Sequence, residues 1–152
     1  MFGASISRVA GAYESRPELR EDLLQEIRLA IWIALPKFRG DSSLRTFVFR
    51  IAHNRALTHI WRRKRGGKSE EAEHLHDARP NPEATVIQHT NESRLMTAVS
   101  QLPIPLRQVI MLALEELPYT EIGAVLGISE GNVAVRVNRA RKLLRENLGG
   151  TR

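Results

Sequence analysis

The side chains best suited to bind another molecule lie in the stretch from Tyr119 to Leu144. Asn132, Arg136 and Arg139 fall on one face of a predicted helix, because residues three or four apart share a helical face. Amide and guanidinium groups donate paired hydrogen bonds to base edges and also bind phosphates. This pattern therefore predicts a surface that binds nucleic acid.

Two short helices around a tight turn are predicted to carry these side chains. Gly127 can adopt the left-handed conformation that ends a helix. The Ser129 hydroxyl can cap the next helix by accepting a hydrogen bond from a backbone N–H that would otherwise be unpaired. Apolar residues recur at helical spacing on the opposite side: Ile122, Val125, Leu126, Val133, Val137, Ala140 and Leu144. The stretch is typical of a helix-turn-helix, which places its second helix in the major groove. An amphipathic hairpin with a solvated basic face is the alternative.

A second cationic segment ends the predicted helix from Leu44 to about Arg65, with the sequence Trp61-Arg62-Arg63-Lys64-Arg65. Cations give salt-dependent affinity for phosphates, and an indole stacked on an unpaired base contributes about 1–3 kcal/mol. The alternatives are a solvated helix end whose charges match the helix dipole, and a core position for Trp61.

The predicted helix from Leu19 to Leu35 has a different character, since Asp22, Gln25, Glu26 and Leu29 share one face. Carboxylates repel phosphate, so this face favours contact with another protein over contact with DNA. A solvated face with acids near the helix N-terminus is the alternative. Pro36 ends the helix, residues 37–43 form a loop, and Asp41 or Ser42 is expected to cap the next helix.

Composition narrows the class of protein. The chain has 152 residues, 23 Lys and Arg against 17 Asp and Glu, and a net charge of +6, which favours a polyanionic partner. The absence of cysteine excludes disulfides, thiolate zinc sites and cysteine nucleophiles. The five histidines lack helical carboxylate partners, so we expect no metal and no cofactor. A nucleic-acid enzyme is disfavoured because no Asp/Glu metal cluster is evident.

Hydropathy and periodicity define the expected architecture. No apolar run approaches the length of a membrane span and no signal peptide is evident, so we expect a cytoplasmic protein. Strand-like alternation is almost absent, which predicts an all-α fold. Two small helical domains, residues 1–65 and 91–152, are expected on either side of a flexible, polar linker, residues 66–90. About 25 extended residues reach roughly 80 Å, more than the 34–36 Å of one turn of B-DNA.

The remaining helices are predicted from shorter signals. Ile6, Val9, Ala10 and Tyr13 share one side of a short first helix. A helix around residues 83–101 begins the second domain, and the next starts at Leu102-Pro103 and is stopped by Pro118.

Two long segments together resemble a known family. The first, DLLQEIRLAIWIALPKFRGDSSLRTFVFRIAHNRALTHIWRRKR, resembles region 2 of bacterial sigma factors of the extracytoplasmic-function class, group IV of the sigma-70 family. The second, LPIPLRQVIMLALEELPYTEIGAVLGISEGNVAVRVNRARKLL, resembles their region 4. The resemblance covers most of residues 19–148. It departs from the family's pattern in a short N-terminal helix and in Ala134 and Val135 near the start of the second helix of the helix-turn-helix.

The resemblance implies a promoter-specificity subunit of RNA polymerase, which is not an enzyme. Its partners would be core RNA polymerase (the clamp helices of the largest subunit, and the flap), promoter DNA and an anti-sigma factor. Polymerase contact would involve Asp22, Gln25, Glu26 and Leu29. Binding of the −10 element would involve Phe38, Arg39, Gly40, Asp41, Ser42, Asn54, Arg55, Trp61, Arg62 and Arg63. Binding of the −35 element would involve Glu130, Asn132, Arg136, Arg139 and Arg141. The alternative is a stand-alone helix-turn-helix regulator with an N-terminal dimerisation or sensing bundle.

Overall fold

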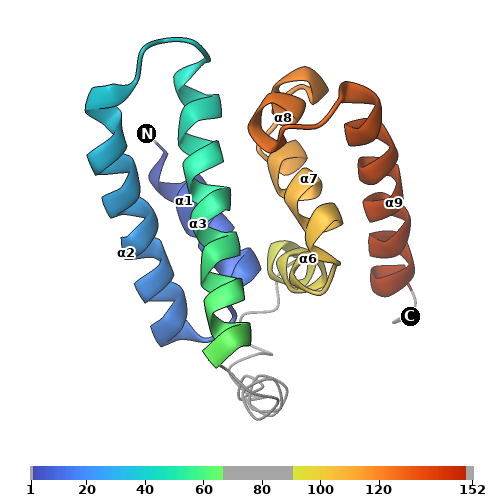
Figure 1. Cartoon of the computed structure of the whole chain (residues 1–152). Coiled ribbons are helices and arrows are strands. Elements are labelled where there is room, and N and C mark those ends of the chain that lie inside the picture. Colours follow the sequence, from blue (N-terminus) through green and yellow to red (C-terminus); the bar gives the residue numbers. More distant parts are fainter. Residues whose placement is uncertain (1, 67–90, 150–152) are drawn as a thin grey trace.

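The computed structural model describes residues 2–66 and 91–149, and every regular element in these two ranges is a helix. In chain order they are α1 (Gly3–Tyr13), α2 (Pro17–Ala34), the 3-10 turn η1 (Leu35–Lys37), α3 (Leu44–Gly66), α6 (Asn91–Ser100), α7 (Ile104–Leu114), α8 (Tyr119–Leu126) and α9 (Glu130–Gly149) (Figure 1). The predicted all-α fold is confirmed.

The N-terminal half is a bundle of α1, α2 and α3, each of which contacts the other two. Pro17 occupies the first turn of α2, where its missing N–H has no helical partner to lose. Leu23 and Ile27 of α2 are completely buried, and burial of each such side chain contributes about 1.5–3 kcal/mol. Pro36 lies inside η1, so α2 ends just before it, as predicted.

The C-terminal half packs α6, α7 and α8 around α9 (Figure 1). The turn of the helix-turn-helix is as predicted: Gly127 has φ of 74°, and the Ser129 hydroxyl accepts the Asn132 N–H at 3.1 Å. Gly123 is also required, because a Cβ there would lie 2.6 Å from the Ile128 carbonyl oxygen. That close approach holds the turn against α8.

Two predicted helix ends were wrong. The cap of α3 is Ser43, whose hydroxyl accepts the Thr46 N–H at 3.0 Å, and not Asp41 or Ser42. Helix α7 ends at Leu114 and the chain then turns through Glu116, at φ of 68°, so Pro118 does not stop α7 but precedes α8. The cap was predicted too early in the chain and the stop too late, because several residues in each loop can serve as a cap or a stop.

Some predictions fall partly outside the described residues. Helix α6 begins at Asn91, and residues 83–90 of the helix predicted there lie outside the described residues, as do linker residues 67–90. Helix α3 runs to Gly66, one residue beyond the predicted first domain.

The two halves contact each other through α3 and α8, α1 and α6, and α1 and α7. Figure 1 shows α3 and α1 between α2 and the C-terminal helices. Across the described ranges, no helix combines the length and apolar character needed to cross a bilayer.

Candidate nucleic-acid and protein interfaces

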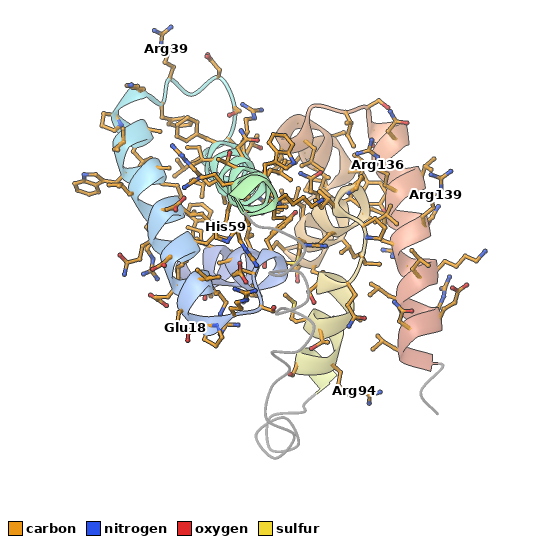
Figure 2. The ribbon with its side chains drawn as sticks, turned by 60° about the horizontal axis from the view of Figure 1, so that its bottom comes forward. Glu18, Arg39, His59, Arg94, Arg136 and Arg139 are labelled. Carbon is orange, nitrogen blue, oxygen red and sulfur yellow. The ribbon has the colours of Figure 1, made fainter. Side chains whose placement is uncertain are left out.

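Helix α9 turns one face to the core and a basic face to solvent. Val133, Val137 and Ala140 are completely buried, and they orient the rest of the helix. The predicted −35 residues lie on the remaining surface: Glu130, Asn132, Arg139 and Arg141 are exposed and Arg136 is half-buried. Figure 2 labels Arg136 and Arg139 along this helix. The face has the spacing and charge to enter a major groove.

Val135 interrupts the polar character of this face, because its side chain is 48% exposed near the start of α9. An apolar side chain at such a position can contact a thymine methyl group but donates no hydrogen bond. Hydrogen bonds to base edges would therefore come from the polar side chains around Val135, such as Asn132, Arg136 and Arg139.

The loop between η1 and α3 carries the first group of predicted −10 residues. The Phe38 ring packs against Phe47 at 4.9 Å between centroids, and this contact anchors one end of the loop. Arg39 is exposed at the outer end of the loop (Figure 2). Gly40 has φ of 83°, a conformation that favours glycine. Asp41 is exposed and Ser42 is half-buried, so the loop presents cationic, acidic and hydroxyl groups on a defined backbone.

The second group of predicted −10 residues lies further along α3. Asn54 and Arg55 are exposed, and Trp61 is 56% exposed, so the indole is not a core residue. The next two cations already have carboxylate partners. Arg62 donates to Glu26 at 3.2 Å, and Arg63 is paired with Glu14. The structure thus leaves Trp61 available for stacking, while Arg62 joins the predicted DNA surface to the predicted polymerase surface.

Sequence reasoning missed the buried cluster of Glu14, His59 and Arg63, called here the Glu14 cluster. The Glu14 side chain is completely buried, His59 Nε2 lies 2.9 Å from Glu14 Oε1, and the Arg16 backbone N–H donates at 3.1 Å. Burial acts to raise the pKa of Glu14, but these hydrogen bonds and the Arg63 charge outweigh it, and the pKa lies below its ordinary value. The cluster fixes the end of α1 to the C-terminal part of α3.

His53 forms a second buried polar contact, since its Nδ1 lies 3.2 Å from the Tyr13 hydroxyl and its Nε2 is buried without a hydrogen-bond partner. Burial lowers the pKa of His53 to about 4, so the ring is neutral at pH 7. Burial also raises the pKa of the Tyr13 phenol. His53 and His59 are therefore held in the interior by hydrogen bonds to Tyr13 and Glu14. His74, His76 and His89 lie outside the described residues. Within the described ranges, no group of three or more His, Asp or Glu is placed to hold a metal ion.

The outer face of α2 carries the predicted polymerase contacts. Asp22 and Gln25 are exposed, Glu26 is half-buried, and Leu29 is 58% exposed. The same face continues into Trp32 and Ile33, which are 75% and 56% exposed. Sequence reasoning missed these two residues, although both lie off the buried stripe of α2. Large apolar side chains gathered on a surface mark a protein interface.

Comparison with known proteins gives the family. Residues 2–66 match Sigma-70 region 2, and residues 92–144 match Sigma-70, region 4. RNA polymerase sigma-H factor of Pseudomonas aeruginosa is 30% identical over 135 residues, covering 82% of this chain and 70% of the relative. The ECF RNA polymerase sigma-E factor of Escherichia coli K12 is 31% identical over 134 residues, covering 81% and 70%.

Two solved structures share the fold. The sigma factor RpoE in complex with the anti-sigma factor NepR from Bartonella quintana has a TM-score of 0.74 at 22% identity, covering 99% of this chain and 93% of that chain. CnrH in complex with the cytosolic domain of CnrY has a TM-score of 0.68 at 24% identity, covering 98% and 83%.

The fold and these matches define an RNA polymerase sigma factor of the sigma-70 family, with a region 2 and a region 4 domain. The chain belongs to its extracytoplasmic-function (ECF) class. It binds core RNA polymerase and DNA, directs promoter recognition, and is not an enzyme. The region 2 match over residues 2–66 leaves no place for the alternative of a stand-alone regulator with an unrelated N-terminal bundle.

Proposed function

We propose that three separate surfaces divide the work of promoter recognition. The outer face of α2 binds the clamp helices of the largest polymerase subunit. Residues 38–42 and the outer side of α3 hold the opened −10 strand. The basic face of α9 binds the −35 element, and the C-terminal domain also contacts the flap. The chain acts in the cytoplasm, where its polymerase and DNA partners are.

The observation that carries this proposal is the chemical difference between the exposed faces. The α2 face combines Leu29, Trp32 and Ile33 with carboxylates, which suits a protein partner and repels phosphate. The α9 face combines Asn132 with arginines and suits duplex DNA. Trp61 projects from α3 beside Arg62, and an exposed indole next to cations suits unpaired bases.

Regulation by an anti-sigma factor is part of the proposal. It is supported by the Bartonella quintana relative, which was solved in complex with its anti-sigma factor NepR. Such a partner would cover the α2 face, because Leu29, Trp32 and Ile33 expose large apolar side chains together on that face.

The two exposed tryptophans provide a matched test. Trp32→Ala should weaken binding to core RNA polymerase by about 30-fold, the effect of losing an aromatic hot spot worth about 2 kcal/mol. Trp61→Ala should bind polymerase like the wild type but lose open-complex formation. Binding is measured by titrating labelled protein with core polymerase, and opening by permanganate footprinting on a cognate promoter. Equal polymerase affinity for Trp32→Ala and wild type would refute the assignment of α2.

A further inference from the structure

The exposed side of α9 has an apolar centre at Val135. Val133 and Val137 are completely buried, and Val135 is two residues from each of them. At 3.6 residues per turn, two residues correspond to more than half a turn, so Val135 lies on the side of the helix opposite the core. Its side chain is 48% exposed. Val135 therefore projects from the middle of the surface that α9 offers to a partner.

Polar side chains flank Val135 along this surface. Asn132 lies three residues before it, Asn138 three residues after it and Arg139 four residues after it, and all three are exposed. Among the described residues of α9, Val135 is the one large apolar side chain that is exposed. Gathered apolar side chains, as on α2, suit a protein partner. A single apolar group among amide and guanidinium groups suits the major groove, where one base carries an exposed methyl group.

The turn before Val135 leaves room for a close approach of the DNA. Gly131 lies four residues earlier on the same side of α9 and is exposed. A Cβ built at Gly131 would meet the Ser129 Oγ at 4.0 Å as its nearest neighbour, so packing does not require a glycine there. A helix position without a side chain allows the backbone to lie close to a ligand. The start of α9 can therefore bring Val135 near the base edges.

The chemistry of the groove determines which base suits a valine. The C5 methyl of thymine is the apolar group that a base pair exposes in the major groove. An isopropyl group placed against another base edge would cover polar atoms without giving them a hydrogen-bond partner, which is unfavourable. Covering one methyl group corresponds to about a fourfold gain in affinity.

We propose that Val135 is a specificity-determining residue of −35 recognition, which selects a thymine through contact between its isopropyl group and the thymine C5 methyl. The inference rests on the proposed function, in which α9 binds the −35 element. Val135 lies between Asn132 and Arg139, which span about 10 Å along the helix axis, or about three base pairs. The selected thymine therefore lies within the short stretch that these two side chains contact.

Replacement of single thymines by deoxyuridine tests this contact, because deoxyuridine lacks the C5 methyl and keeps the same hydrogen-bonding groups. Holoenzyme reconstituted from the full chain and core RNA polymerase first selects its −35 sequence from a library of random duplexes. Each thymine of the selected element, on either strand, is then replaced in turn. Affinity is measured by competition with the unmodified, fluorescein-labelled duplex. One replacement should weaken binding by the wild type about fourfold.

Val135→Ala links the methyl group to this side chain. The variant lacks both γ-methyl groups, so it should bind the thymine and deoxyuridine duplexes with nearly equal affinity. Lys142→Ala, at an exposed position further along α9, is the matched control. It should weaken binding to all duplexes alike by loss of phosphate attraction, and it should keep the fourfold ratio. Circular dichroism checks that both variants keep their helices.

Methylated cytosine gives the converse measurement at the same position. With cytosine in place of the sensitive thymine, 5-methylcytosine should bind the wild type about fourfold more tightly than cytosine, because the methyl group returns to the same place in the groove. Val135→Ala should not distinguish the two. This pair of duplexes separates contact with the methyl group from any other property of thymine.

Two outcomes would overturn the inference and leave the −35 assignment of α9 intact. One is a wild-type holoenzyme that prefers the selected element over a scrambled one but tolerates every deoxyuridine replacement. The other is a Val135→Ala holoenzyme that keeps the full fourfold ratio. A wild-type holoenzyme with no preference for any −35 sequence would instead refute the assignment of α9, and the contact of Val135 with it.

Discussion

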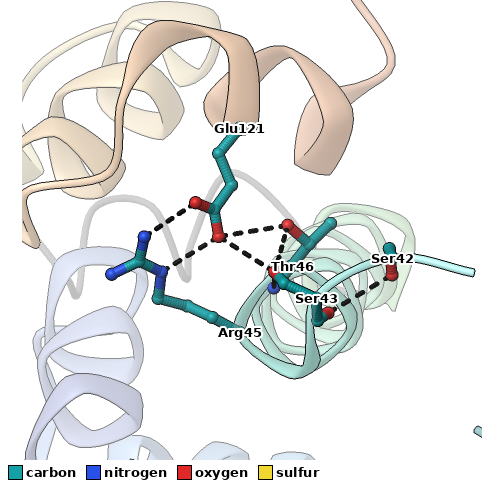
Figure 3. A network of polar contacts seen from close by, with 5 residues as sticks. All are labelled: Ser42, Ser43, Arg45, Thr46 and Glu121. Carbon is teal, nitrogen blue, oxygen red and sulfur yellow. Dashed lines mark hydrogen bonds and ion pairs between the residues drawn. The ribbon is translucent and has the colours of Figure 1, made fainter. Parts of the chain in front are cut away.

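The Glu14 cluster and the Glu121 cluster, in which Glu121 of α8 accepts hydrogen bonds from Ser43, Arg45 and Thr46 (Figure 3), use similar groups in very different settings. The Glu14 side chain is completely buried within the N-terminal half, and its partners His59 and Arg63 are 9% and 19% exposed. Glu121 joins the two halves with a side chain that is 16% exposed, and its partner Arg45 is 43% exposed. A carboxylate that is fully desolvated must keep its partners, whereas one near solvent can exchange them for water or phosphate.

This difference separates the parts of the molecule that must stay assembled from the part that can open. The Glu14 cluster holds the end of α1 on α3, and without it the region 2 bundle would contain an unpaired buried charge. The Glu121 cluster holds one folded half on the other, and its arginine, Arg45, remains accessible to a competing anion.

The largest effect is expected from Glu14→Ala, which leaves Arg63 and His59 without their carboxylate. Removing one partner of a buried ion pair costs about 3–5 kcal/mol. Urea denaturation followed by circular dichroism measures the loss in the free energy of unfolding. A loss below about 1 kcal/mol would show that the buried cluster is as dispensable as a surface pair.

Acid should weaken the interior before it weakens the contact between the halves. His53 has a pKa of about 4 when folded and 6.5 when unfolded, so the unfolded state binds the extra proton between these values. The free energy of unfolding should therefore fall by about 3 kcal/mol as pH drops from 6.5 to 4. His53→Gln should show a much flatter profile in that window.

The distance between spin labels attached at Thr58→Cys on α3 and Glu146→Cys on α9, both exposed positions, should stay constant down to about pH 5 in the same titration. The pKa of Glu115 and that of Glu121 lie below the ordinary carboxyl value of 4.5, so both remain charged there. If the halves opened over the same pH range in which the free energy of unfolding falls, the buried interior and the contact between the halves would not respond to acid independently, contrary to this prediction.

The smallest effect is expected from Glu121→Gln on the free energy of unfolding. A partly exposed pair contributes about 0–1 kcal/mol, so the denaturation midpoint should hardly change even though the halves separate more readily. Glu116→Gln is the matched control for loss of charge. A loss comparable to that of Glu14→Ala would mean that the contact between the halves is part of the fold.

The sequence predicted the elements better than the contacts between them. Gly127, Ser129 and the buried stripe of α9 act locally, so their spacing was sufficient. Glu14 and His59 are 45 positions apart, and Ser43 and Glu121 are 78 apart, so no periodicity links them. His53 and His59 are polar side chains, but pairing with Tyr13 and Glu14 allows both to be buried.

The sequence likewise predicted single site residues better than the contacts between distant ones. The assignment of residues to the −10 and −35 elements stays a prediction, and the structure shows that these residues lie at the surface of the molecule. Trp32 and Ile33 could have been found from the sequence as apolar residues off the buried stripe of α2. The hydrogen bonds of Arg45 and Arg50 with α8 could not, because they depend on how the two halves pack.

The exposure of Trp32 and Trp61 also determines how this protein can be observed. The chain has two tryptophans, and they lie on the surfaces proposed for polymerase and for the −10 strand. Each indole therefore serves as a built-in fluorophore for one partner, and a single Trp→Phe replacement leaves the other as the sole emitter of its kind. Holoenzyme assembly and strand capture can thus be followed as separate optical signals in real time, without attaching a dye.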